Sequence, residues 1–172
     1  DVRGRASRTG EGLDAAGRRL RHAWLEKVRR HYRADRIALA HHLDDHVETL
    51  LMWLGRGTGL SGLVGIPPVR SRIVRPLREL RRADLRAECE RKGWNWLEDP
   101  TNAEPVTARN RLRRDVMPAL EDALGPGSIE RMGAMSARAV VERAALEQFG
   151  ADFLDRSLIR SASHELEVDR EQ

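Results

Sequence analysis

The stretch that decides the fold class is residues 37–49, which read IALAHHLDDHVET. Ile37–Ala40 is a short apolar run with the length of a buried strand. A helix is predicted from about Asp45 to Leu54, with Asp44 as its N-cap. Its apolar stripe, which would pack on a sheet, consists of Val47, Leu50, Leu51 and Leu54. A strand that leads directly into such a helix is typical of a sheet covered by helices.

The segments on both sides of this stretch continue the alternation of helices and strands. Apolar periodicity predicts a helix over Leu13–Tyr32, whereas residues 1–12 are expected to be loop or disorder. A glycine-rich loop follows from Gly55 to Gly65, and a strand is predicted over Arg72–Arg75. The predicted fold class is therefore α/β, with a parallel sheet.

The second half of the chain is expected to be mostly helical. One helix is predicted over Arg82–Lys92, ended by Gly93 in the usual C-terminal position. Another is capped by Thr107 and should be kinked or ended early by Pro118. A last long helix is predicted from Ser128 to about residue 156. The sheet is thus expected to be followed by a helical C-terminal segment.

The composition excludes several classes of protein. The single cysteine, Cys89, cannot form an internal disulfide and rules out a CxxC motif. No apolar run is long enough to span a bilayer, and no charged and apolar leader opens the chain. We therefore expect a cytoplasmic protein without a membrane partner.

Positive charge is concentrated in the first part of the chain and is carried almost entirely by arginine. The formal net charge is +4, and Lys27 and Lys92 are the only lysines. From Pro126 onward the net charge is −3, so the preceding part carries +7. A basic front part indicates a polyanionic partner. A solvated, arginine-rich surface is the alternative, and charge alone does not choose between the two.

The densest cluster of chemically active side chains follows the predicted strand Ile37–Ala40. Ligands bind at the carboxyl ends of strands in parallel sheets, where His41 and the residues up to Asp45 would lie. Asp45 and Glu48 are three residues apart and should lie close together on one face of the helix. Two carboxylates at a helix start can hold a cation, an amine or Mg²⁺. The alternative is a solvated acidic first turn.

The same segment can be compared with the metal-binding motif of metallo-β-lactamase-like hydrolases. Such enzymes hold two metals with HxHxDH, whereas this sequence reads HHLDDH from His41. Leu43 stands where a histidine ligand is required, and ligand spacing sets the geometry of a metal site. This reading is therefore disfavoured.

Two further groups of residues are candidates for phosphate binding. Gly57, Thr58 and Gly59 lie in the glycine-rich loop, whose backbone could approach a phosphate but does not match GxxxxGK[ST]. The arginine-rich candidates are Arg18, Arg21, Arg109, Asn110, Arg111 and Arg113. Arg109 and Arg113 should share one helix face. Arginine clusters contact phosphates, but they also occur on solvated helix faces, so both interpretations stay open.

Taken together, these segments resemble the tRNA(Ile)-lysidine synthetases in order and wording, over about residues 12–124. The family shows paired arginines, HHxDDxxET, a RGTGLxGLxGMPP-like loop, RPL, WxxDPTN and RNRxR. The corresponding segments here are Arg18–Arg21, His41–Thr49, Arg56–Pro68, Arg75–Leu77, Trp96–Asn102 and Arg109–Arg113. Ile66 replaces the usual methionine of the loop. Several linked motifs in one order are far more specific than any one of them.

The resemblance implies a Rossmann-like ATP pyrophosphatase fold of the adenine nucleotide alpha-hydrolase type. It implies adenylation of the wobble cytidine of tRNA(Ile) with ATP and Mg²⁺, followed by displacement of AMP by the side-chain amine of lysine. His41, Asp45 and Glu48 would be catalytic, with Asp45 as the Mg²⁺ ligand, and the two phosphate-binding groups above would hold ATP and the anticodon region. Residues 1–118 would be part of the catalytic domain and residues 119–172 a helical linker or tail. A homodimer is one expected assembly.

One departure from the family concerns the pyrophosphate-binding loop. Family members begin with a strand and an SGGxDS loop, and the sequence contains no such motif. We therefore expect an incomplete sheet and an inactive chain when these 172 residues are taken alone.

Two other functions stay open. The 2-thiocytidine tRNA enzymes share the HHxDD and glycine-loop wording but hold an iron–sulfur cluster with cysteines, of which only Cys89 is present. A non-catalytic remnant that binds RNA through its arginines is the candidate from another class.

Overall fold

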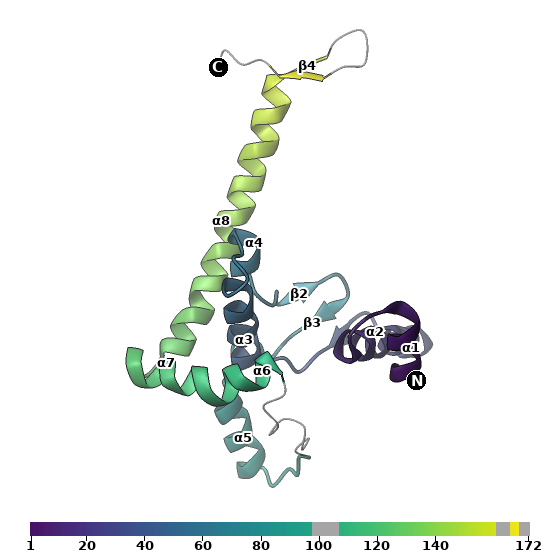
Figure 1. The fold of residues 1–172 in the computed structure, drawn as a ribbon, viewed down its shortest axis with the longest axis vertical. Coiled ribbons are helices and arrows are strands. Elements are labelled where there is room, and N and C mark those ends of the chain that lie inside the picture. The colour runs from purple at the N-terminus through teal and green to yellow at the C-terminus, as the bar shows by residue number, and fades with distance from the viewer. Residues whose placement is uncertain (98–106, 161–165, 169–172) are drawn as a thin grey trace. The chain divides into compact units, whose positions relative to one another are not determined.

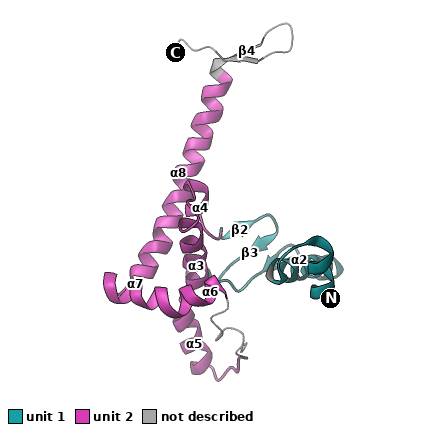
Figure 2. Cartoon of the chain, in the orientation of Figure 1, with its two compact units in different colours: residues 1–41, 67–78 teal, residues 42–66, 79–172 magenta. Residues whose placement is uncertain are grey.

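A computed structural model describes residues 1–97, 107–160 and 166–168 and shows a mixed α/β chain (Figure 1). The chain divides into two compact units, which are described separately (Figure 2). Unit 1 comprises residues 1–41 and 67–78, and unit 2 comprises residues 42–66 and 79–172. Among the described residues, no helix combines the length and apolar character that crossing a membrane would require.

Unit 1 begins with two helices, α1 (Val2–Thr9) and α2 (Leu13–His31). The expectation of loop or disorder for residues 1–12 is therefore wrong. The Asp1 side chain accepts a hydrogen bond from Arg3 N at 3.0 Å, and Gly10 ends α1 in the left-handed conformation at φ 68°. Since α1 buries none of its residues, it carries no apolar stripe by which sequence periodicity could reveal it.

The sheet of unit 1 has the strand order β1-β3-β2. The strands are β1 (Ile37–Ala38), β2 (Val69–Arg70) and β3 (Ile73–Val74). The predicted parallel pairing is confirmed for β1 and β3, with Ile37 opposite Ile73. The sheet is nevertheless mixed, because β2 pairs antiparallel with β3 across a tight turn in which Ser71 has φ 55°.

Unit 2 is built around α3 (Leu43–Leu54) and the long helix α8 (Ser128–Ser157), which lie side by side in Figure 1. Its other elements are α4 (Leu60–Leu63), α5 (Arg82–Arg91), α6 (Ala108–Arg111), the π-helix η2 (Leu112–Val116), α7 (Met117–Leu124), β4 (Leu158–Arg160) and β5 (Leu166–Val168). The strands β4 and β5 pair antiparallel.

The core of unit 2 is formed between helices. Leu43 and Val47 of α3 pack with Met117 of α7 and Ile129 of α8. Within unit 2, Val47 and Leu51 of the predicted α3 stripe therefore pack against other helices, and the packing of the stripe on a sheet stays a prediction. Leu54, which was assigned to the same stripe, is 45% exposed because it lies at the end of α3, beyond this core.

The start of α3 differs from the prediction by the residue that caps it. His42, and not Asp44, is the N-cap: its Nδ1 accepts a hydrogen bond from Asp45 N at 3.3 Å. His42 N in turn donates to Asp45 Oδ2 at 3.2 Å, which completes a capping box. Asp44 instead accepts from Arg82 N at 2.8 Å and so satisfies a backbone donor at the start of α5.

The helix predicted from Thr107 is confirmed at its start and altered in its middle. The Thr107 hydroxyl accepts from Asn110 N at 3.1 Å, as an N-cap should. Pro118 lies in the first turn of α7, preceded by η2. Since proline has no N–H to donate, wider π-type bonding ahead of it lets the chain stay helical rather than stop. The predicted helix end at Gly93 agrees with α5, whose last residue is Arg91. The end predicted near residue 156 agrees with α8, which ends at Ser157.

Two glycines of α8 allow its packing on α3 to be tested. A Cβ added at Gly133 would lie 2.5 Å from Leu43 Cδ1, whereas one added at Gly150 would meet nothing within 4 Å. Gly150→Ala should stabilise the chain by up to about 1 kcal/mol through helix propensity. Gly133→Ala should destabilise it by about 1–2 kcal/mol, because Leu43 is buried and cannot move aside freely. Urea unfolding followed by circular dichroism measures both; stabilisation by both variants would contradict the packing of α8 on α3.

Candidate functional site

Two carboxylates of α3 face two arginines of α6 and η2, all within unit 2. Glu48 has no exposed surface. Two guanidinium nitrogens of Arg113 donate to its carboxylate: Nε lies 2.6 Å from Oε1, and Nη2 lies 3.0 Å from Oε2. The same Nη2 donates to Asp45 Oδ1 at 3.0 Å. Arg113 therefore bridges the two carboxylates that sequence spacing placed on one face.

Arg109 closes the cluster from one turn before Arg113. Its Nε lies 3.3 Å from Glu48 Oε2, and its Nη2 donates to Thr49 Oγ1 at 2.7 Å. The Thr49 hydroxyl donates in turn to Asp45 O at 2.9 Å. The predicted shared face of Arg109 and Arg113 is thus confirmed, and both side chains contact Glu48.

Burial governs the electrostatics of this cluster. It raises the pKa of Glu48, an effect that the hydrogen bond and charge of Arg113 partly offset. Burial also opposes the Arg113 cation, but the hydrogen bond and charge of Glu48 outweigh it and raise the pKa of Arg113. Burial lowers the pKa of His42, which favours the neutral imidazole that caps α3. The site is therefore a buried carboxylate that needs a bound cation, at present an arginine.

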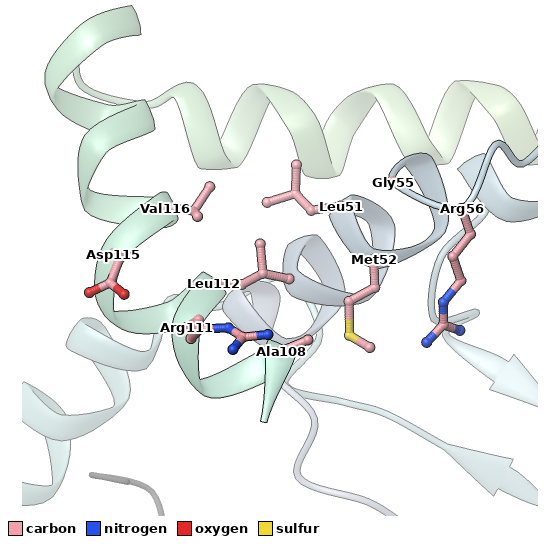
Figure 3. Close-up of a pocket in the computed structure, with 9 residues that line it drawn as sticks. All are labelled: Leu51, Met52, Gly55, Arg56, Ala108, Arg111, Leu112, Asp115 and Val116. Carbon is pink, nitrogen blue, oxygen red and sulfur yellow. The ribbon is translucent and has the colours of Figure 1, made fainter. Parts of the chain in front are cut away.

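An apolar pocket continues the site along α3. Met52 lies one helical turn beyond Glu48, and with Leu51 it faces Leu112 and Val116 of η2 across a cavity of about 480 Å³. Figure 3 shows the residues that line it on α3, in the loop just after α3, and on the segment from α6 through η2. Its polar lining is Arg56, Arg111 and Asp115. Such a mostly apolar cavity with a few charged groups has the character of a small-molecule site.

The other predicted residues occupy different places. Arg18 and Arg21 are exposed on α2, and His41 is half-buried at the end of the segment that follows β1, so these three belong to unit 1. Gly57 and Gly59 are exposed in unit 2, with open space where a Cβ would be, and Thr58 lies half-buried between them. Asn110 donates its backbone N–H to the cap of α6. The WxxDPTN segment lies largely outside the described residues.

The predicted Mg²⁺ ligand can be compared with this geometry. Asp45 Oδ1 accepts from Arg113 and Oδ2 from His42 N, so both oxygens are already hydrogen-bonded. Across the part of the chain that the structure describes, no group of three or more metal-ligating side chains occurs. Binding of Mg²⁺ at Asp45 would bring the ion beside the Arg113 guanidinium, and it stays a prediction.

Two positioning residues were missed by sequence reasoning. His46 is fully buried, and its Nδ1 accepts from Ile66 N at 3.0 Å, which fastens the end of the glycine-rich loop to α3. Gly65, at φ 59°, leaves no room for a Cβ, which would lie 2.5 Å from the His46 ring. Arg81 joins four helices through Asp44, Glu121 and Glu130. The only sequence signal for these two residues was His46 itself, the third histidine of HHLDDH. Their contacts join residues 20 to 49 positions apart and leave no local pattern in the sequence.

With this geometry established, comparison with known proteins defines the class. Residues 1–120 match the family model described as PP-loop domain, and the chain belongs to that family. Within it, the relatives that the chain resembles are tRNA(Ile)-lysidine synthases, which confirms the resemblance inferred from the motifs.

Three of these relatives show the extent of the similarity. The protein of Leifsonia xyli is 44% identical over 121 residues, covering 70% of this chain and 36% of the relative. That of Salinispora tropica is 37% identical over 159 residues, covering 90% and 46%. That of Mycobacterium leprae is 37% identical over 153 residues, covering 89% and 46%. The chain thus spans less than half the length of each of these relatives.

The buried ion pair predicts a pH-dependent loss of stability. Arg113→Met removes the main cation of Glu48 and should destabilise the chain by about 3 kcal/mol at neutral pH. Without Arg113, burial raises the folded-state pKa of Glu48 further above its ordinary 4.5. A carboxyl whose pKa is raised in the folded state stabilises the fold at pH values below its unfolded-state pKa. This contribution is lost as the pH rises through its folded-state pKa. The destabilisation should therefore shrink as pH falls from 7.5 towards 4.5.

Urea unfolding at several pH values measures this difference, with Arg91→Met as the control. Arg91 pairs with Glu88 at 2.7 Å on the exposed face of α5, so its loss should change stability little at any pH. A pH-independent penalty for Arg113→Met would show that Arg113 acts by packing alone.

Proposed function

We propose that the protein carrying this sequence is a tRNA(Ile)-lysidine synthetase. It would be a ligase that uses ATP to activate the wobble cytidine of tRNA(Ile) and then joins the side-chain amine of lysine to it. The observation that carries the proposal is the pair of α3 carboxylates, Asp45 and Glu48, around one cation at 2.6–3.0 Å. The names of the relatives and the PP-loop family support it. A Rossmann-like sheet, of which β1 and β3 would be part, belongs to the same proposal.

The carboxylates would receive the lysine ammonium in place of Arg113. An ammonium has three donors, enough to reach both Asp45 and Glu48 as Arg113 does here. The amine must lose a proton before it attacks. Glu48 is suited to accept this proton because burial raises its pKa, and it becomes a better proton acceptor once Arg113 has moved away.

The neighbouring elements would hold the nucleotides. ATP, when bound, supplies the adenylyl group that turns the cytidine carbonyl oxygen into a good leaving group. The apolar walls of the pocket, Met52 and Leu112, suit a flat base, and Arg56 and Arg111 suit a phosphate of the tRNA or of ATP. The exposed loop from Gly57 to Gly59 would let a phosphate approach the backbone. Arg18 and Arg21 would contact the anticodon backbone of tRNA.

Several finer features stay predictions within this proposal. These are Mg²⁺ at Asp45, a catalytic role for His41, a homodimer, and the division between residues 1–118 and 119–172, which falls within α7. A non-catalytic RNA-binding protein is the second candidate, favoured by the exposed arginines of α2. The thiolating relatives are not favoured, because Cys89 is the sole cysteine and lies within α5.

The lysine-binding role is tested by Glu48→Gln, which keeps the shape and removes the charge. Lysidine formation by the gene product that carries this sequence should require at least about tenfold more lysine, because a hydrogen bond to a charged group is lost. Glu88→Gln, an exposed change on α5, is the control and should leave the lysine requirement unchanged. Circular dichroism checks that Glu48→Gln folds, and Glu48→Asp, which retains charge, should recover part of the affinity. Full activity of Glu48→Gln at limiting lysine would exclude the assigned role.

Replacement of Arg111 tests whether this residue contacts tRNA or ATP. Arg111→Ala should weaken tRNA binding in a filter assay and flatten the slope of log K against log salt concentration by about one unit per lost phosphate contact. If Arg111 instead holds ATP, the variant requires more ATP and binds tRNA normally. Arg138→Ala, on an exposed position of α8, is the matched control. An unchanged tRNA affinity and ATP requirement would place Arg111 on a solvated helix face.

A further inference from the structure

Charge is divided very unevenly between the two units. Unit 1 contains fifteen Lys and Arg against five Asp and Glu, a net charge of +10, whereas unit 2 contains sixteen against twenty-two, a net charge of −6. Among the described side chains of unit 1, Glu26 pairs with Arg29 and Arg30, and Glu11 pairs with Arg19. Unit 1 therefore keeps a large excess of positive charge, part of it on α2 itself.

Arg75, directly after β3, is the most unusual of these cations. Only 6% of the surface of Arg75 is exposed to solvent. Nη1 donates to Pro67 O at 2.7 Å, while Nε is buried and has no hydrogen-bond partner among the described residues. Across the same described residues, no ion pair joins Arg75 to a carboxylate. A guanidinium does not lose its proton in proteins, so this charge persists although it is buried.

The groups around Arg75 add positive charge instead of compensating it. Burial lowers the pKa of Arg75, and the charges of Arg18, Arg70 and Arg78 lower it further. The pKa of His22 is lowered by burial and then by Arg18, Arg21 and Arg75. Helix α2 and the β2–β3 hairpin thus bring their cations to one place within unit 1.

A buried charge without a counter-charge is costly, and the cost falls when an anion binds. We propose that Arg75, together with the exposed Arg18 and Arg70, forms a binding site for a phosphate oxyanion. The exposed pair would hold the anion over the buried guanidinium, whose forked donors match phosphate geometry. This inference rests on the proposed function only for the source of the phosphate, which would be ATP or the RNA backbone.

The test uses inorganic pyrophosphate as the probe and the melting temperature of the chain as the readout, at constant ionic strength. A ligand that binds the folded state raises the melting temperature with its concentration. Three forms are compared: the wild type, Arg75→Gln, and Arg72→Gln as a control. Arg72 is exposed in the turn of the same hairpin, so its replacement changes net charge equally. Pyrophosphate should stabilise the wild type and Arg72→Gln, and binding to Arg75→Gln should be weaker by about tenfold or more.

The outcomes distinguish a site from a structural role. For a binding site, the gap in melting temperature between wild type and Arg75→Gln widens as pyrophosphate is added. A constant gap would mean that Arg75 only fastens Pro67, and equal losses for both variants would mean diffuse attraction; either result overturns the proposal. Competition of the bound pyrophosphate by ATP or by an anticodon stem–loop RNA then identifies the source. Since no step needs lysidine formation, failure of the proposed function would leave this result unaffected.

Discussion

Burial of the Glu48 carboxylate is the constraint on which unit 2 depends. Helix α3 places Val47 in the apolar core and Glu48 beside it, and both residues are fully buried. An ionised carboxylate at such a position is stable only with a matched cation, which Arg113 supplies through two hydrogen bonds. The segment from α6 through η2 must therefore lie against α3, and the same requirement forms one wall of the apolar pocket.

The remaining polar ties fix the first turn of α3 and the glycine-rich loop that follows this helix. At its start, Asp44 accepts from Arg82 N, and Arg81 links the same carboxylate to Glu121 of α7 and Glu130 of α8. Further along, His46 and Ser136 hold the glycine-rich loop, the latter by donating to Val64 O at 2.8 Å. These ties leave the face with Asp45 and Glu48 in a defined geometry, which a site for a small amine requires.

Sequence patterns predicted what is local and missed what is set by tertiary contacts. Thr107, Gly93 and the three-residue spacing of Asp45 and Glu48 were interpreted correctly, because caps and helical faces depend on residues a few positions apart. Asp44 was assigned as the cap of α3 because aspartate is common there, but its carboxylate is engaged by α5, 38 residues away. That Val47 of the α3 stripe packs with Met117 of α7 and Ile129 of α8 is set by tertiary contacts, and periodicity does not contain that information.

The two units also differ in how they balance charge, and this difference bears on function. In unit 2 the buried carboxylate of Glu48 already holds a cation, so another cation such as an amine can enter only by exchange with Arg113. In unit 1 the buried cation of Arg75 holds no anion among the described residues, so an anion can enter without exchange. Exchange is selective, because the incoming group must match the donors that it replaces. An uncompensated cation is less discriminating and attracts any phosphate. A protein that must select one amine and also hold a polyanion would use these two arrangements for those two tasks.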